Sequence, residues 1–186
     1  MKRSIIILFV LTFAIQTKSQ QFEVKALYGS PSLMDATATI FSILGTTFAG
    51  TEEAWAISQG TLDVEFYLNS DNRKWQYGIA LINGFYKGHY DISKQNLFMV
   101  LPTVNHYWTK PERKFRVYSG VSLGVGFLSR KWETDQSEDQ QLEQSDTFLG
   151  FNIMPVGLRY GRDFGINFEL NLVMKPVASL GFSYQF

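Results

Sequence analysis

Most of the chain beyond residue 20 alternates between apolar and polar residues with a period of two, the pattern of a β-strand with one apolar face. In TLDVEFYL, for example, Leu62, Val64, Phe66 and Leu68 occupy every second position. The pattern predicts eight strands, at 21–29, 60–69, 74–87, 96–108, 114–128, 147–160, 164–173 and 178–186. Their lengths match or slightly exceed the roughly 9–11 residues that a tilted strand needs to cross a bilayer.

The connections between these segments alternate in length. Those after the second, fourth and sixth segments are short and turn-like (SDNR, TKPER and GRD), whereas those after the first, third and fifth are longer. The connection MKPVA after the seventh segment is short and departs from this rule. Short turns at one end and longer loops at the other are typical of a β-barrel that spans a membrane.

The two faces of the predicted strands differ in chemistry. One face is apolar, while the other is rich in Gly, Ser, Asn and Tyr and poor in lysine, as expected of a crowded lumen rather than a water-facing surface. Alternation alone also allows a secreted lipocalin-like barrel, in which the apolar face points inward. The polar face carries Thr61, Asp63, Glu65, Tyr67, Gln76, Gly78, Ala80, Arg116, Tyr118, Gly120, Ser122, Gly124, Gly126, Asn167, Glu169 and Asn171.

Aromatic residues gather where the predicted strands end. Membrane interfaces select such rings because they combine an apolar body with a polar edge. Two belts are therefore expected, one at each end of the barrel. The short-turn belt would contain Phe66, Tyr67, Trp75, Tyr107, Trp108, Phe115, Tyr160, Phe164, Tyr184 and Phe186, and the other belt Tyr28, Phe85, Tyr86, Phe98, Phe127 and Phe148.

The first residues have the features of a secretory signal peptide. Lys2 and Arg3 precede an apolar run from Ile5 to Ile15, and this run is shorter than the roughly 18–20 residues of a spanning helix. We expect residues 1–19 to be removed and residues 20–186 to form one barrel domain. Without Lys2, Arg3 and Lys18 the chain has 14 basic and 17 acidic groups, a net charge near −3 that does not favour nucleic-acid binding.

These features together resemble the small eight-stranded outer-membrane β-barrels of Gram-negative envelopes, such as the OmpA-, OmpX- and OmpW-like proteins. The resemblance covers nearly all of residues 20–186 and rests on architecture. It implies an all-β, eight-stranded antiparallel up-and-down transmembrane barrel, monomeric and surrounded by outer-membrane lipid. In those proteins the last strand and its terminal aromatic residue are the signal for the barrel-assembly machinery. The ending ASLGFSYQF gives this role to Tyr184 and Phe186.

Three segments depart from a regular barrel pattern. Pro102 and Pro155 lie inside predicted strands, where a missing backbone donor favours a β-bulge. The fourth segment is apolar on both faces near NLFMVLP, so its orientation is left open. In the first long connection, Leu33, Thr37, Ile40, Phe41, Leu44 and Phe48 follow a three- and four-residue spacing, which fits a short amphipathic helix over the rim, on the membrane surface or as a lid.

The residues that could perform catalysis form only weak patterns. His89, Asp91 and Ser93 contain the residue types of a hydrolytic triad, but a polar loop explains them better. The known lipid A deacylase barrels have a histidine and a serine two residues apart on one strand, and here Trp108 stands at that distance from His106. Two histidines and no cysteine disfavour a metal site. We expect no enzyme activity, no metal and no cofactor.

The best candidate site is a set of charged residues on the inward face: Asp63, Glu65, Arg116, Arg159 and Glu169. Charges inside a narrow barrel must pair, because an isolated charge is costly to desolvate. The set is interpreted as a salt-bridge network that fills the lumen, with a polar passage or binding site as the alternative. The acidic connection that carries Glu133, Asp135, Glu138, Asp139, Glu143 and Asp146 is expected to be a solvated surface loop, with cation or partner binding as the alternative.

The sequence thus predicts a non-enzymatic outer-membrane barrel with a structural or surface-interaction role through its external loops. The alternatives are an OmpW-like conduit or binder for small apolar molecules and a lipid-modifying outer-membrane enzyme. The expected partners are lipid, the assembly machinery, and an extracellular ligand or small apolar molecule.

Overall fold

The computed structural model describes residues 22–33, 57–87, 92–132 and 143–186. The predicted signal peptide, most of the predicted helix at 33–48, the pair His89 and Asp91, and most of the acidic connection lie outside these residues. No helix among the described residues is both long enough and apolar enough to cross a membrane.

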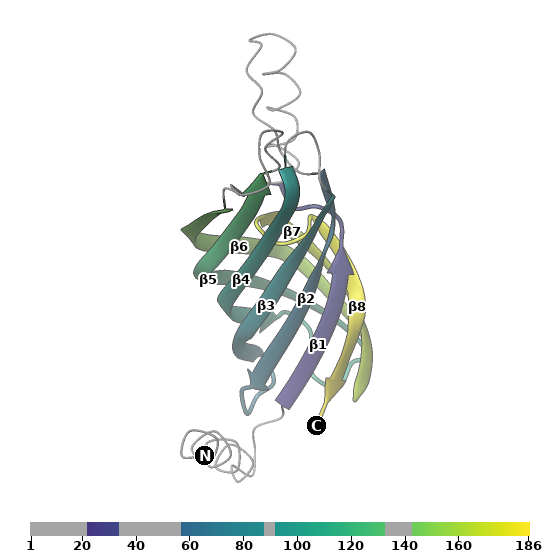
Figure 1. Ribbon diagram of the computed structural model, residues 1–186. Coiled ribbons are helices and arrows are strands. Elements are labelled where there is room, and N and C mark those ends of the chain that lie inside the picture. Colours follow the sequence, from purple (N-terminus) through teal and green to yellow (C-terminus); the bar gives the residue numbers. More distant parts are fainter. Residues whose placement is uncertain (1–21, 34–56, 88–91, 133–142) are drawn as a thin grey trace, which may run out of the picture.

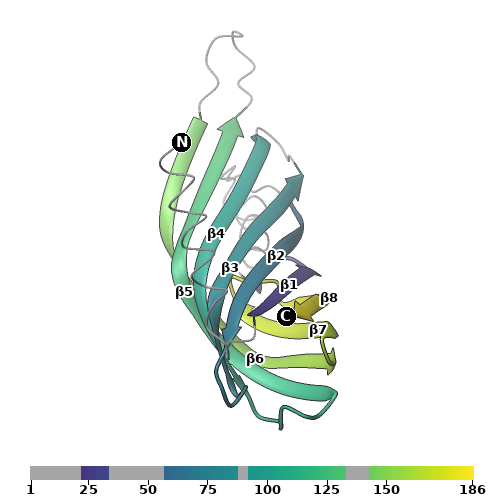
Figure 2. The ribbon, with the colours of Figure 1, turned by 90° about the horizontal axis from the view of Figure 1, so that it is seen from below.

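Eight strands follow one another around a closed barrel, and every neighbouring pair is antiparallel (Figures 1 and 2). The first strand pairs with the last, from Glu23 opposite Gln185 to Gly29 opposite Ser179. This closure removes the free sheet edges, and the predicted fold class is confirmed. The strands are β1 (Phe22–Gly29), β2 (Ile57–Asn69), β3 (Trp75–Lys87), β4 (Ile92–Tyr107), β5 (Phe115–Trp132), β6 (Glu143–Gly161), β7 (Phe164–Val173) and β8 (Ala178–Gln185).

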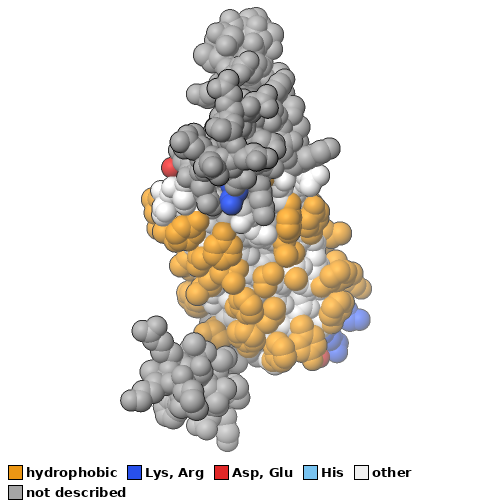
Figure 3. All heavy atoms as spheres, viewed as in Figure 1, with side chains coloured by type: hydrophobic (Ala, Val, Ile, Leu, Met, Phe, Trp, Pro, Cys, Tyr) orange, Lys and Arg blue, Asp and Glu red, His pale blue; other side chains and the backbone are white. Residues whose placement is uncertain are grey.

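The apolar face of the strands points outward, as predicted. Along β5, Val121, Leu123 and Val125 are exposed, whereas Ser122 between them is buried. Figure 3 shows apolar side chains over the barrel wall, with the visible charged side chains only near its two ends. β4 takes the orientation that the sequence left open: Gln95, Leu97, Met99, Leu101, Thr103, Asn105 and Tyr107 face inward.

The bulge predicted at Pro155 is confirmed. The register between β6 and β7 shifts between Ile153 and Val156. On the other side of β6, its register with β5 shifts between Tyr118 and Gly120. The bulge predicted at Pro102 is wrong. The pairing of β4 with β5 skips Leu101 and Pro102 but resumes in the same register, because the missing donor interrupts the ladder without inserting a residue.

The barrel wall is higher at β5 and β6 than at β7 and β8. Asn152 of β6 pairs with Val173 at the end of β7, so residues 143–151 of β6 extend beyond β7 and pair with β5 alone. Glu143 and Asp146, predicted to lie in a surface loop, are therefore strand residues. The connector from β7 to β8 turns into the barrel, and its residues Met174, Lys175 and Pro176 are buried.

Four residues that we assigned to the aromatic belts do not face outward. Tyr67 and Tyr107 are buried in the lumen, because their positions in β2 and β4 share the phase of the polar face. Tyr86 and Phe148 pack against an apolar cluster inside the barrel. The remaining short-turn aromatics are exposed on the outer surface, including Trp75, Trp108, Phe115, Tyr160 and Phe164.

Candidate functional site

Among the residues that the structure describes, eight charged residues are buried in the barrel lumen, four acidic and four basic. They come from β1, β2, β5, β6, β7 and the β7–β8 connector, and the inward phase of each strand directs their side chains into the interior. All five residues predicted from the sequence are among them. The full set is Glu23, Lys25, Asp63, Glu65, Arg116, Arg159, Glu169 and Lys175.

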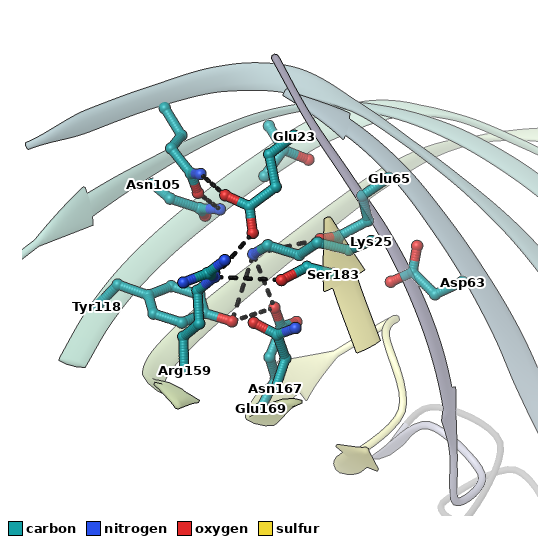
Figure 4. Close-up of polar contacts among 12 residues, drawn as sticks. Glu23, Lys25, Asp63, Glu65, Asn105, Tyr118, Arg159, Asn167, Glu169 and Ser183 are labelled. Carbon is teal, nitrogen blue, oxygen red and sulfur yellow. Dashed lines mark hydrogen bonds and ion pairs between the residues drawn. The ribbon is translucent and has the colours of Figure 1, made fainter. Parts of the chain in front are cut away.

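The central charge cluster joins two lysines to three carboxylates. The Nζ atom of Lys175 lies 2.7 Å from Asp63 and 3.4 Å from Glu169, and it also contacts Glu65. Lys25 Nζ lies 3.4 Å from Glu169 and 3.7 Å from Glu65 (Figure 4). Each lysine therefore bridges two strands or more, and the cluster ties β1, β2 and β7 together through the lumen.

Aromatic side chains complete the central cluster. The hydroxyl of Tyr118 donates a hydrogen bond of 2.7 Å to Glu169. Lys25 Nζ lies 4.7 Å from the ring centre of Tyr67 and 4.4 Å from that of Tyr118, so its charge also faces two π-systems. The Tyr118 ring fits because Gly157 lies beside it on β6, where a Cβ atom would stand 2.4 Å from the ring.

A second charge cluster lies nearer the short turns. Arg159 Nε donates to Glu23 over 3.1 Å and to the Ser183 hydroxyl over 3.1 Å, as Figure 4 shows. Glu23 accepts two further hydrogen bonds, of 2.6 Å from Gln76 and 2.7 Å from Gln185. This pair is well satisfied, which is what a buried ion pair needs if desolvation is not to outweigh the attraction.

The predicted salt-bridge network is present in the lumen, but it consists of two separate clusters. Asp63, Glu65 and Glu169 meet in the central cluster, and Arg159 belongs to the second cluster. Arg116 joins neither of them through an ion pair among the described residues. Chemically, paired and hydrogen-bonded charges of this kind cross-link the wall and fill the lumen.

The sequence analysis missed Glu23, Lys25 and Lys175. Glu23 and Lys25 alternate with Val24 and Ala26 in β1, so period-two alternation could have placed them inward. Lys175 lies in a short connector, where a lysine normally faces solvent. Only the inward turn of this connector brings it to the carboxylates, and no local pattern signals that turn.

An inner apolar cluster occupies another part of the lumen, and two of its residues, Ala80 and Ile82, lie on β3 opposite Glu65 and Asp63 of β2. It consists of Ala80, Ile82, Leu97, Met99, Leu101 and Met174. Met174 comes from the β7–β8 connector, and its sulfur accepts a hydrogen bond from the Phe151 amide of β6, over 3.2 Å. That amide lies on the part of β6 that has no partner in β7.

The residues considered for catalysis or metal binding do not form a site among the described residues. The His106 ring lies between those of Trp75 and Trp108, tilted against the first and edge-on to the second, with ring centres 4.4 and 4.7 Å away, and Trp108 donates a hydrogen bond to Ser119. Ser93 lies in β4. Within the described ranges, no three His, Cys, Asp or Glu side chains are grouped so that they could hold a metal ion.

The last strand presents both predicted signal residues on the outer surface. Tyr184 and Phe186 are exposed, with ring centres 4.8 Å apart. Phe186 also contacts the ring of Phe22 at 5.8 Å, and its amide donates to the Phe22 carbonyl. These contacts attach the end of β8 to the start of β1.

Comparison with solved structures finds a likeness in fold. No family model and no curated protein matches the sequence. Among solved structures, the chain is similar to the N-terminal β-barrel domain of Pseudomonas aeruginosa OprF. The two are 16% identical, the alignment covers 90% of this chain and 98% of that one, and the TM-score is 0.46. Identity this low assigns no function.

Proposed function

We propose that this chain is an integral outer-membrane β-barrel protein without enzymatic activity. The observation that carries the proposal is the inside-out distribution of its side chains: charged residues are buried in the lumen and large apolar residues cover the outer wall. In water, such a wall would be an exposed apolar surface far larger than soluble monomers display. In a bilayer, the same apolar wall would contact the hydrocarbon chains of lipid. Because the barrel is closed, the backbone hydrogen-bonding groups of each strand are paired with those of its neighbours.

The orientation follows from the connectors. In barrels of this class short turns face the periplasm and longer loops face outward. The connectors after β2, β4 and β6 would therefore lie in the periplasm, and those after β1, β3 and β5 at the cell surface. In this proposal the surface connectors carry a structural or interaction role, and Tyr184 and Phe186 are presented to the assembly machinery.

A second candidate function is the binding of a small apolar molecule. The observation that favours it is the inner apolar cluster, which contacts Phe148 and Phe151 in the part of β6 without a β7 partner. Native mass spectrometry of the purified barrel tests it, since a retained apolar molecule that is lost in Leu101→Glu would support this function. If the purified barrel retains no apolar molecule, the result would favour the interaction role of the surface connectors.

Membrane insertion is tested by fractionation. Cells that express the full chain should yield the protein with outer membranes, and unheated samples should migrate differently from boiled samples on a gel, because hydrogen-bonded barrels resist detergent. Recovery of the protein in the soluble periplasm, with no effect of boiling, would contradict the proposal and favour a secreted barrel.

A further inference from the structure

The short-turn end of the barrel contains a cavity of about 280 Å³ that is rich in arginine. Three turns surround it, and the inward side chains Arg116 and Arg159 form its inner wall. Five arginines and two carboxylates line the cavity, the latter from Glu112 and Asp163. Even when Arg159 is set against its partner Glu23, four guanidiniums face two carboxylates, and the cavity remains positive.

Arg116 is the residue that makes this cavity unusual. The residue is only 3% exposed, yet no carboxylate lies within ion-pair distance of its guanidinium among the described residues. Its Nε has no hydrogen-bond partner within the described ranges, and Nη2 donates to the Arg73 carbonyl over 2.6 Å. The guanidinium carbon stands 3.6 Å from the ring centre of Tyr107. A carbonyl and a ring face leave most of this buried charge uncompensated.

The strand register increases the cost of this arrangement. Arg116 of β5 is directly opposite Arg159 of β6, and both side chains point inward. Like charges at opposed positions destabilise a sheet, and among the described residues Glu23 forms its ion pair with Arg159 and none with Arg116. An anion in the cavity would neutralise Arg116 and reduce this repulsion.

We propose that this cavity binds a small phosphate-bearing anion, with Arg116 as its central ligand. Guanidinium groups match the oxygens of phosphate through paired hydrogen bonds, which a single ammonium does not provide. The volume lies just below the roughly 300–1,000 Å³ of pockets for drug-sized ligands, so it suits inorganic phosphate, pyrophosphate or one headgroup phosphate. Arg73, Arg113 and Arg162 come from three different turns, so they can approach the anion from separate sides.

Binding is tested by titrating pyrophosphate into the folded full-length barrel in an uncharged maltoside detergent at low ionic strength, with calorimetric detection. We expect saturable binding to one site that weakens with added salt. Arg116→Gln should weaken it by about tenfold or more, since hydrogen bonds to charged groups contribute about 1.5–3 kcal/mol. Arg130→Gln is the matched control, because it removes the same charge from the other end of β5 and should change the affinity little.

Two further measurements keep the result interpretable. If Arg116→Gln does not show the heat-dependent gel shift of a folded barrel, Arg113→Gln in the β4–β5 turn replaces it and should still weaken binding. Vesicles that contain phosphatidylglycerol identify the source of the phosphate. Binding to these vesicles that Arg116→Gln weakens, with no binding of pyrophosphate, would assign the site to a lipid headgroup. Absence of saturable binding to either probe, or an equal loss in Arg130→Gln, would overturn the proposal.

Discussion

At the scale of single residues, Lys175 has the largest predicted effect on stability. It is the counterion of three buried carboxylates, and Lys25 reaches only two of them. Lys175→Met keeps the length of the side chain but removes its charge, so it leaves Asp63 without a cation. Removal of one partner from a buried ion pair costs about 3–5 kcal/mol. Denaturant unfolding in detergent should show a loss of that order, and Lys110→Met in an exposed turn should show almost none.

The same variant predicts a dependence on pH. In Lys175→Met, the cost arises from negative charge on carboxylates that have lost their cation. Protonation removes this charge, so the difference in stability between variant and parent should shrink as the pH falls. A difference that stays constant from neutral to acidic pH would show that Lys175 acts through packing alone.

Sequence reasoning succeeded for residues whose role follows from strand phase. Asp63, Glu65, Arg116, Arg159 and Glu169 all face the lumen, because alternation fixes the face of a residue once the strand is recognised. Alternation says nothing about which inward residues meet across the barrel. Arg116 forms no ion pair with any described carboxylate, and Lys175 reaches the cluster from a connector. Both facts depend on the register of several strands at once.

At the scale of elements, the β6–β7 turn depends on Gly161. This residue has φ of 143°, and a Cβ atom built on it would stand 2.0 Å from the Phe164 carbonyl oxygen. Gly161→Ala should therefore destabilise the folded barrel by about 1–3 kcal/mol, the usual cost of a residue held in such a conformation. Arg162→Ala, in the same turn but with an exposed side chain, is the control. Equal denaturation midpoints for the two variants would contradict this role of Gly161.

The ends of the strands were predicted less well than their existence. β5 continues to Trp132 and β6 begins at Glu143, although the segments SRK (129–131) and EQSD (143–146) are polar and do not alternate. Backbone pairing extends these two strands from Lys131 opposite Glu143 onward. Alternation with apolar residues is expected only where a strand faces lipid. It therefore stops before the backbone pairing of β5 with β6 stops.

At the scale of the whole molecule, the filled lumen predicts poor conduction. Eight strands leave an interior just wide enough for side chains, and Tyr67, Tyr107, Tyr118 and Arg159 are fully buried there. The central charge cluster further cross-links the wall across this interior. Purified barrels in planar bilayers should therefore show no large, steady ionic current. A stable porin-like conductance from single barrels would contradict the filled lumen.

Contact of the outer wall with lipid is tested directly by a fluorescent label at single positions. The chain has no cysteine, so a cysteine at Val121, Leu123 or Val125 labels one place on the outer face of β5. Cysteines at Asn72 and Glu112, in two exposed turns, are the controls. In vesicles that contain brominated phospholipids, we predict strong quenching at the three β5 positions and weak quenching in the turns. Weak quenching on β5, together with strong quenching there by aqueous iodide, would contradict a membrane-spanning barrel.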